Sequence, residues 1–193
     1  LILTIQNPDG SMATWNNTLK VESGQVLREP NFTLPSDKVA LADPKLESAE
    51  SERLASIYGV ITQEQFWQGN FTHPVEGKMG SPFGSVRTYT NDGSIHRHTG
   101  YDLVVPIGTP VLASADGRIV FAHALPIHGN IVIVDHGRGV FSSYAHLSAI
   151  YVVPGQFVLQ GDLLGLSGTT GRSTGPHVHW EIAVNGVQVD PIS

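Results

Sequence analysis

Hydrophobic and polar residues alternate along short runs over most of the chain after residue 71. The clearest run is 177–184, in which Val178 and Trp180 alternate with His177 and His179. A two-residue repeat is that of a β-strand, whose successive side chains point to opposite faces. We therefore expect one face of this strand to be buried and the other to carry the histidines. Further runs rich in β-branched residues lie at 118–123, 130–135, 140–147 and 163–167.

Turn sequences separate these runs. Asn185-Gly186 is typical of a two-residue hairpin turn, and 135–139 is a somewhat longer one. The stretch 153–164 resembles the repeating turns of biotinyl and lipoyl barrels, and no helical pattern follows Gly69. The sequence therefore predicts a mainly β fold, an antiparallel barrel-like sandwich, over residues 71–193.

The N-terminal part of the chain has a different pattern. Residues 1–6 and 11–21 are typical of two strands, and the turn sequence 7–10 joins them. A lone hairpin is marginally stable in water, so we interpret 1–21 as the end of an upstream β-sandwich domain. An extended connector with one short strand is expected at 22–43.

A helical repeat follows this connector. Residues 45–58 place apolar side chains among charges, after Asp43-Pro44 and before Gly59, which are typical helix start and stop signals. We interpret the charged face of this helix as a solvated surface. A further helical turn is expected at 62–67, with Thr62 and Gln65 forming a capping box. The predicted division is thus 1–21, 22–70 and 71–193.

Composition narrows the possible functions. The 193 residues include no cysteine, which excludes a thiol nucleophile, a disulfide scaffold and a cysteine-based zinc finger. The net charge of −6 and the lack of a basic run argue against nucleic acid as the main partner. No apolar run is long enough for a membrane helix. Leu1 opens on strand-like sequence, so we expect a mature or trimmed chain whose targeting signal lies outside it.

Two clusters of metal-ligating residues stand out. His177 and His179 share the open face of the last long strand, and His98 and Asp102, four residues apart, are expected to share a strand face as well. Gly100 between them has no side chain to fill the space. Two histidines and a carboxylate suit a catalytic zinc, which keeps three protein ligands and a fourth position for water. The sequence therefore predicts a zinc hydrolase.

The residues around these clusters occur in a specific order. Ser81-Pro82-Phe83-Gly84 comes first, then His98-x3-Asp102, then Tyr144-Ala145-His146-Leu147, and finally the run 170–181 that ends in His177-Val178-His179-Trp180-Glu181. This order closely resembles that of the lysostaphin-type zinc metallopeptidases, which cut peptide bonds in bacterial peptidoglycan. The resemblance covers roughly 71–192, and Trp180 replaces the family's usual phenylalanine.

The resemblance implies a role for each matching residue. His98, Asp102 and His179 would bind one zinc ion per chain, and His146 and His177 would be catalytic. One of these two histidines would take a proton from the attacking water and pass it to the leaving amine, and the other would donate to the oxyanion. Which does which stays open, as does the oligomeric state. The substrate would be peptidoglycan peptide, in the bacterial cell envelope, periplasmic or extracellular, with a possible membrane anchor or upstream domain.

Other candidate residues receive structural interpretations. Glu181 is expected to be a structural partner rather than a fourth ligand. Arg87 would orient its loop or bind a substrate carboxylate, and His96 belongs to the loop before the His98 strand or to the groove. The histidines without partner spacing are expected to be structural: His73, His123, His128 and His136.

Three rival functions fit the sequence less well. A biotinyl or lipoyl carrier needs an exposed lysine, and no lysine follows Lys78. A serine hydrolase needs a Gly-x-Ser-x-Gly elbow before a helix, which 165–169 does not provide. A catalytically silent relative that binds peptidoglycan or activates another cell-wall hydrolase typically loses metal ligands, whereas this chain keeps them all.

Overall fold

The N-terminal hairpin forms as expected. The computed structural model describes residues 2–6, 11–16 and 26–192. Strands β1 (Ile2–Gln6) and β2 (Met12–Asn16) pair in antiparallel fashion. The turn predicted at 7–10 and the end of the second predicted strand, 17–21, lie outside the described residues. That this hairpin ends an upstream domain stays a prediction.

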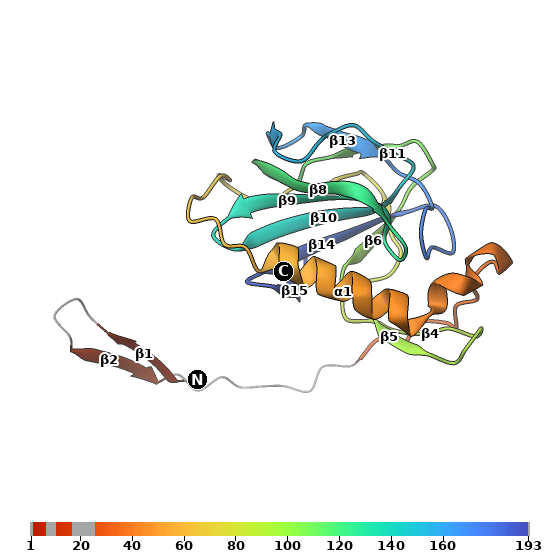
Figure 1. Ribbon diagram of the computed structural model, residues 1–193, viewed down its shortest axis with the longest axis horizontal. Coiled ribbons are helices and arrows are strands. Elements are labelled where there is room, and N and C mark those ends of the chain that lie inside the picture. Colours follow the sequence, from red (N-terminus) through yellow and green to blue (C-terminus); the bar gives the residue numbers. More distant parts are fainter. Residues whose placement is uncertain (1, 7–10, 17–25, 193) are drawn as a thin grey trace.

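A large antiparallel sheet organises the rest of the chain (Figure 1). The hairpin predicted at Asn185-Gly186 is confirmed, since this turn joins the last two strands. The other predicted hairpin forms, but its turn is shorter than the predicted 135–139, because β9 (Gly129–Gly137) and β10 (Val140–Leu147) are separated only by 138–139. In spatial order the strands are β12 (Phe157–Val158), β8 (Gly117–Leu125), β9 (Gly129–Gly137), β10 (Val140–Leu147), β14 (Val178–Val184), β6 (Tyr101–Val104) and β3 (Lys78–Met79), with β15 (Val187–Val189) paired to β14.

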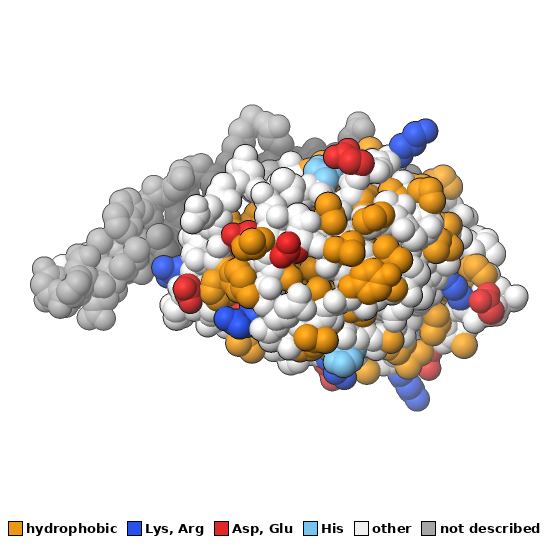
Figure 2. Space-filling model, turned by 90° about the horizontal axis from the view of Figure 1, so that it is seen from above, with side chains coloured by type: hydrophobic (Ala, Val, Ile, Leu, Met, Phe, Trp, Pro, Cys, Tyr) orange, Lys and Arg blue, Asp and Glu red, His pale blue; other side chains and the backbone are white. Residues whose placement is uncertain are grey.

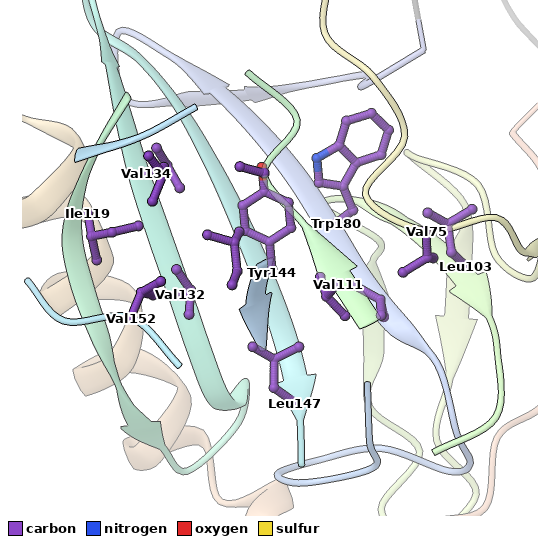
Figure 3. Close-up of a cluster of buried hydrophobic side chains, with 14 of the residues drawn as sticks. Val75, Leu103, Val111, Ile119, Val132, Val134, Tyr144, Leu147, Val152 and Trp180 are labelled. Carbon is purple, nitrogen blue, oxygen red and sulfur yellow. The ribbon is translucent and has the colours of Figure 1, made fainter. Parts of the chain in front are cut away.

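A smaller sheet covers one face of the large one. It runs in the order β11 (Ala149–Ile150), β13 (Leu163–Leu166) and β7 (Pro110–Leu112). Between the two sheets lies the main hydrophobic core, in which Trp180, Tyr144 and Leu147 are almost completely buried (Figure 3). The predicted burial of Val178, Trp180 and Ile182 is confirmed, and so is the mainly β sandwich architecture. A separate hairpin, β4 (Val86–Thr88) and β5 (Ile95–Arg97), stands beside them.

Helix α1 (Pro44–Tyr58) packs against the opposite face of the large sheet (Figure 1). The predicted helix boundaries are confirmed: the Asp43 side chain accepts a hydrogen bond from the Lys45 N–H at 2.9 Å, and Gly59 is the C-cap. Leu54 and Tyr58 form a second apolar cluster with side chains of β8, β9, β10 and β14. The prediction that the charged face of this helix is solvated is wrong at Glu50, which is only 4% exposed.

The residues on either side of α1 differ from the prediction. The connector holds a 3₁₀-helix, η1 (Ser36–Ala42), and its extended part makes isolated parallel bridges from Arg28 to Val86 and from Phe32 to Tyr89. The helical turn predicted at 62–67 is wrong, because this segment runs along the end of β9 and takes its hydrogen-bond partners there. The Phe66 N–H donates to the His136 carbonyl at 2.9 Å, for example. After Gly69 the described residues form no helix, as expected.

Large apolar side chains gather on the outer face of the small sheet. Figure 2 looks onto this face. Leu112 and Leu163, which face each other across β7 and β13, are partly exposed, and Tyr151 and Val153 lie in the segment after β11. The described part of the chain has no helix long and apolar enough to cross a membrane.

Candidate metal centre

The two metal-ligating clusters meet on the α1 face of the large sheet. His179 of β14 is the direct register partner of Asp102 of β6, which confirms that the two stretches lie on neighbouring antiparallel strands. His98 and Asp102 do not share a strand, contrary to expectation, because β6 begins at Tyr101 and His98 lies in the link from β5. Gly100 lets this link cross β14 closely, since a Cβ there would lie 2.5 Å from the Trp180 carbonyl oxygen.

Three side-chain atoms converge at this point. His98 Nε2 lies 3.0 Å from Asp102 Oδ1 and 2.9 Å from His179 Nδ1, and His179 Nδ1 lies 2.9 Å from Asp102 Oδ1. All three side chains are buried. Tetrahedral zinc ligands at the usual bond lengths lie roughly 3.3 Å apart. A small outward movement of the three atoms would therefore accommodate a metal ion.

The outer nitrogens of both histidines already have acceptors. His98 Nδ1 donates to the Pro82 carbonyl at 3.0 Å, and His179 Nε2 donates to Glu181 Oε1 at 2.9 Å. The protons on these outer nitrogens leave lone pairs on the inner ones, which point at each other and at Asp102. Lone pairs this close repel one another, and a metal ion among them would remove that repulsion. Such outer partners are typical of histidines that bind metals.

Asp102 is held by charged neighbours. Arg87 Nη2 donates to its second oxygen, Oδ2, and Arg87 Nε lies 3.2 Å from Glu29 Oε1. Arg87, expected to orient its loop or bind substrate, is thus engaged by the Asp102 carboxylate. Asp102 stays an anion available to a metal ion.

His146 and His177 lie beside this cluster, and the centroids of their two rings are 4.7 Å apart. His146 Nδ1 donates to the Thr170 carbonyl and His177 Nδ1 to the Gly175 carbonyl, both at 2.8 Å. In each neutral ring the other nitrogen, Nε2, is therefore free of a proton, and His177 Nε2 lies 3.7 Å from Asp102 Oδ1. Burial lowers the pKa of both histidines, so both are neutral at pH 7.

His146 reaches the site through a break in its strand. Regular alternation would put His146 on the same face as Ser142 and Tyr144, which is the core face. Instead the pairing of β10 with β9 shifts between Tyr144 and Leu147, and His146 takes the left-handed backbone conformation, with φ of 62°. Both Tyr144 and Leu147 then point into the core while His146 faces the groove. The side chains of this strand therefore stop alternating at its end.

The structure brings two further residues to the site: Glu50, which the sequence did not single out, and His128, which was expected to be structural. Glu50 accepts hydrogen bonds from the backbone N–H groups of Ile127 and His128, at 2.7 and 2.9 Å, and from His128 Nδ1. His128 Nε2 lies 3.9 Å from Glu181 Oε1. Burial would lower the pKa of His128, but the Glu181 and Glu50 carboxylates raise it to about 9. No sequence signal links Glu50 to His128, since 78 residues separate them.

Asp102 and His177 line a cavity of about 320 Å³. His98, His146, His179, Glu50 and His128 line a neighbouring cavity of about 390 Å³ between α1 and the sheet. On its far wall, Glu47 of α1 lies 3.0 Å from His96 Nδ1 and 3.0 Å from Arg172 Nη1. His128, His179 and Glu181 form a second group whose donor atoms lie within 4.8 Å of one another. Within this second group His179 Nε2 donates its proton to Glu181, and His128 Nε2 lies 3.9 Å from the same carboxylate oxygen, so we interpret the group as the outer support of His179.

The other histidines lie outside the site. His73 packs on the ring of Trp180, with centroids 5.5 Å apart, and His123 on that of Phe121. His136 is completely buried, donates to the Asp116 carbonyl at 2.8 Å and accepts from the Ser142 hydroxyl at 2.7 Å. Burial lowers its pKa to about 4. For these three the structural interpretation fits the contacts.

Comparisons with known proteins agree on one family. The profile of Peptidase family M23 matches residues 96–191. The chain is 42% identical over 120 residues to the peptidoglycan DD-endopeptidase ShyA of Vibrio cholerae, a match over 61% of this chain and 28% of the relative. It thus spans roughly a quarter of the length of the curated relatives it matches.

Solved structures give the same result. The catalytic domain of lysostaphin from Staphylococcus simulans is 34% identical, with a TM-score of 0.52 over 60% of this chain and 90% of that domain. A zinc-containing peptidase from Vibrio cholerae is also 34% identical, with a TM-score of 0.61 over 65% of this chain and 40% of that one.

Proposed function

The chain belongs to peptidase family M23, the lysostaphin-type metallopeptidases, and from this premise we propose that it is a zinc-dependent endopeptidase of bacterial peptidoglycan. The proposed ligands are His98, Asp102 and His179, with one zinc ion per chain. The proposal rests mainly on one observation: His98 Nε2, Asp102 Oδ1 and His179 Nδ1 lie within 3.0 Å of one another. The other ring nitrogen of each histidine donates its proton to a different acceptor.

The donor set suits zinc. Two imidazole nitrogens and one carboxylate oxygen leave a fourth position open, which is the arrangement of catalytic rather than structural zinc sites. When bound there, zinc would supply a Lewis acid and lower the pKa of a coordinated water toward about 7. The Arg87 contact keeps Asp102 ionised and oriented.

His146 and His177 are the proposed proton carriers. Their Nδ1 protons are held by backbone carbonyls, so each presents a proton-free Nε2. Burial keeps both rings neutral, which allows one of them to accept a proton from the attacking water. Once protonated, that ring can deliver the proton to the leaving amine. The other ring would donate a hydrogen bond to the oxyanion only as an imidazolium, with a second proton taken up on Nε2 from solvent water.

The proposed substrate is a peptide cross-link or stem peptide of peptidoglycan. The support comes from the relatives, among them a peptidoglycan DD-endopeptidase and a DD-carboxypeptidase/endopeptidase. This substrate would locate the protein in the bacterial cell envelope, on the periplasmic or extracellular side. The division into 1–21, 22–70 and 71–193 is kept as part of the proposal, with 71–193 as the peptidase domain.

The alternative is a catalytically silent relative that binds peptidoglycan or activates another hydrolase. Loss of a ligand or of a proton carrier would favour it. Here the three ligand atoms and both neutral histidines are all present, so this alternative has no specific observation in its favour.

The decisive experiment is digestion of purified peptidoglycan of defined cross-link, with products identified by mass spectrometry. Zinc content is measured in the same preparation. We expect about one zinc per chain, new amine and carboxyl termini within the peptide, and loss of hydrolysis on chelation that zinc restores. A chain with zinc bound that releases no peptide product would support the silent alternative.

A further inference from the structure

We propose that Glu50 and His128 are positioning residues, through which helix α1 holds both the ligand His179 and the proton carrier His146 in place. This inference rests on the proposed metal site. It assigns a role in that site to a helix outside the 96–191 region that the family profile matches. Its basis is a continuous set of contacts from Glu50 to the two histidines.

The first contact anchors the turn between β8 and β9. Both Glu50 oxygens are used: Oε2 accepts from the Ile127 N–H at 2.7 Å, and Oε1 accepts from the His128 N–H at 2.9 Å and from its ring Nδ1. Glu50 is only 4% exposed. A carboxylate is costly to bury unless its hydrogen bonds are made, so its position is closely defined by these three donors.

The second contact leads to the metal ligand. The far side of the His128 ring faces Glu181, with His128 Nε2 at 3.9 Å from Glu181 Oε1. The same Oε1 accepts the His179 Nε2 proton at 2.9 Å. His128 thus lies between two buried carboxylates, one on α1 and one beside the ligand. The His128 ring thus faces the same buried carboxylate oxygen that His179 uses as its acceptor.

The third contact leads to the proton carrier. The His146 N–H donates to the His128 carbonyl at 2.8 Å, and the Arg172 N–H donates to the Ile127 carbonyl at 2.8 Å. The first bond holds the backbone of His146 at the point where its strand breaks. The second holds the loop whose Thr170 carbonyl accepts the His146 ring proton. Movement of the 127–128 turn would therefore displace the backbone of His146 and the acceptor of its ring.

The attachment of α1 to the sheet does not need Glu50. Leu54 and Tyr58 already bury apolar surface against the large sheet. A buried carboxylate in the same helix adds no apolar contact. Its specific contribution is to fix the 127–128 turn, which fits a positioning role better than a role in helix adhesion.

The test uses the whole chain and three variants: Glu50→Gln, His128→Gln and the matched control Glu52→Gln, which removes one exposed charge from the same helix. Zinc affinity is measured by competition with a chromogenic chelator, and the visible spectrum of the cobalt-substituted protein reports ligand geometry. We expect about 10-fold weaker zinc binding and a changed cobalt spectrum in Glu50→Gln and His128→Gln, with the control unchanged. On a peptide substrate, kcat should fall while KM stays the same.

A double variant separates positioning from general damage. Because Glu50 acts both on the His128 ring and on the backbone of the same turn, Glu50→Gln with His128→Gln should weaken zinc binding more than either variant alone but less than two independent effects combined. Zinc affinity and cobalt spectrum unchanged in both folded single variants would overturn the positioning proposal. Should Glu50→Gln fail to fold by circular dichroism, His128→Gln decides in the same way. A wild-type chain that binds no zinc would instead refute the proposed function.

Discussion

The two faces of strand β14 are equally buried but carry opposite chemistry. Trp180 is 1% exposed on the core face, and Glu181 is also 1% exposed on the groove face. Trp180 packs among apolar side chains from both sheets (Figure 3). Glu181 accepts hydrogen bonds from His179 and Thr99. Burial alone therefore does not separate core from site; the direction and number of hydrogen bonds do.

The two faces should also respond differently to substitution. Contacts on the core face depend on volume and apolar area, so a side chain of similar size can replace another. Contacts on the groove face depend on particular atoms, so the loss of a single nitrogen or oxygen is felt even when shape is kept. Variants on each face make this difference measurable.

The largest expected effect is on the groove face. Alanine at His98, Asp102 or His179 should abolish zinc binding and bring hydrolysis below detection, because each supplies one of three converging atoms. Metal analysis and a peptidoglycan digestion assay measure the two losses, and circular dichroism checks that the chain is folded. Full zinc occupancy in Asp102→Ala would show that the ligands are misassigned.

On the core face the expected loss is one of stability. Trp180→Ala should lower the free energy of unfolding by about 3–5 kcal/mol, as truncation of a large buried aromatic side chain does. Urea denaturation measures it. Trp180→Phe is the matched control, and its free energy of unfolding should fall clearly less. The folded fraction of either variant should still bind zinc. Loss of zinc from folded Trp180→Phe would contradict the separation of the two faces.

His146→Ala and His177→Ala test the groove face beyond the ligands. Both variants should keep the metal while the rate falls at least about 100-fold, or about 2.7 kcal/mol in activation free energy, since positioned acid–base groups contribute that much. Zinc analysis and initial rates on one preparation give both values. A histidine whose removal releases zinc is a ligand instead, and near-normal rates in both variants would refute the mechanism.

A histidine on the core face gives the smallest effect. Burial lowers the pKa of His136 to about 4 from the ordinary 6.5, so between these values the unfolded chain binds a proton that the folded chain does not. The neutral, buried His136 therefore contributes fully to the free energy of unfolding above pH 6.5. This contribution is lost as the pH drops toward 4, by about 2 kcal/mol between pH 7 and 5. Urea denaturation at the two pH values measures it. His136→Gln should reduce the dependence by that amount, and an equal dependence in the variant would assign it to other groups.

The sequence predicted those features that a local repeat determines. The alternation of 177–184 gave the buried face of β14, and the Asn185-Gly186 turn and the ends of α1 followed from local signals. The order of motifs was enough to predict the three metal-ligating residues as a group. Whether they bind zinc stays a prediction.

Features that depend on distant partners were not predictable in this way. The segment 62–67 has a helical capping pattern, yet the end of β9 offered it backbone partners that a local pattern does not include. His128 lacked any neighbour of suitable spacing because its partner, Glu50, lies on a helix 78 residues earlier. The break in β10 at His146 was likewise invisible, because left-handed backbone there is imposed by the neighbouring strands.

The left-handed backbone conformation of His146 lowers the stability of the fold at a residue that the proposed activity needs. A residue with a Cβ costs on the order of 1 kcal/mol in this conformation, and glycine adopts it freely. A search for thermostable variants should therefore favour glycine at 146, and each such variant would lack the imidazole proposed to carry the proton. A thermostable variant that keeps the proposed activity would therefore need stabilising substitutions at other positions. The core face is one such place, because its side chains do not contact the proposed site.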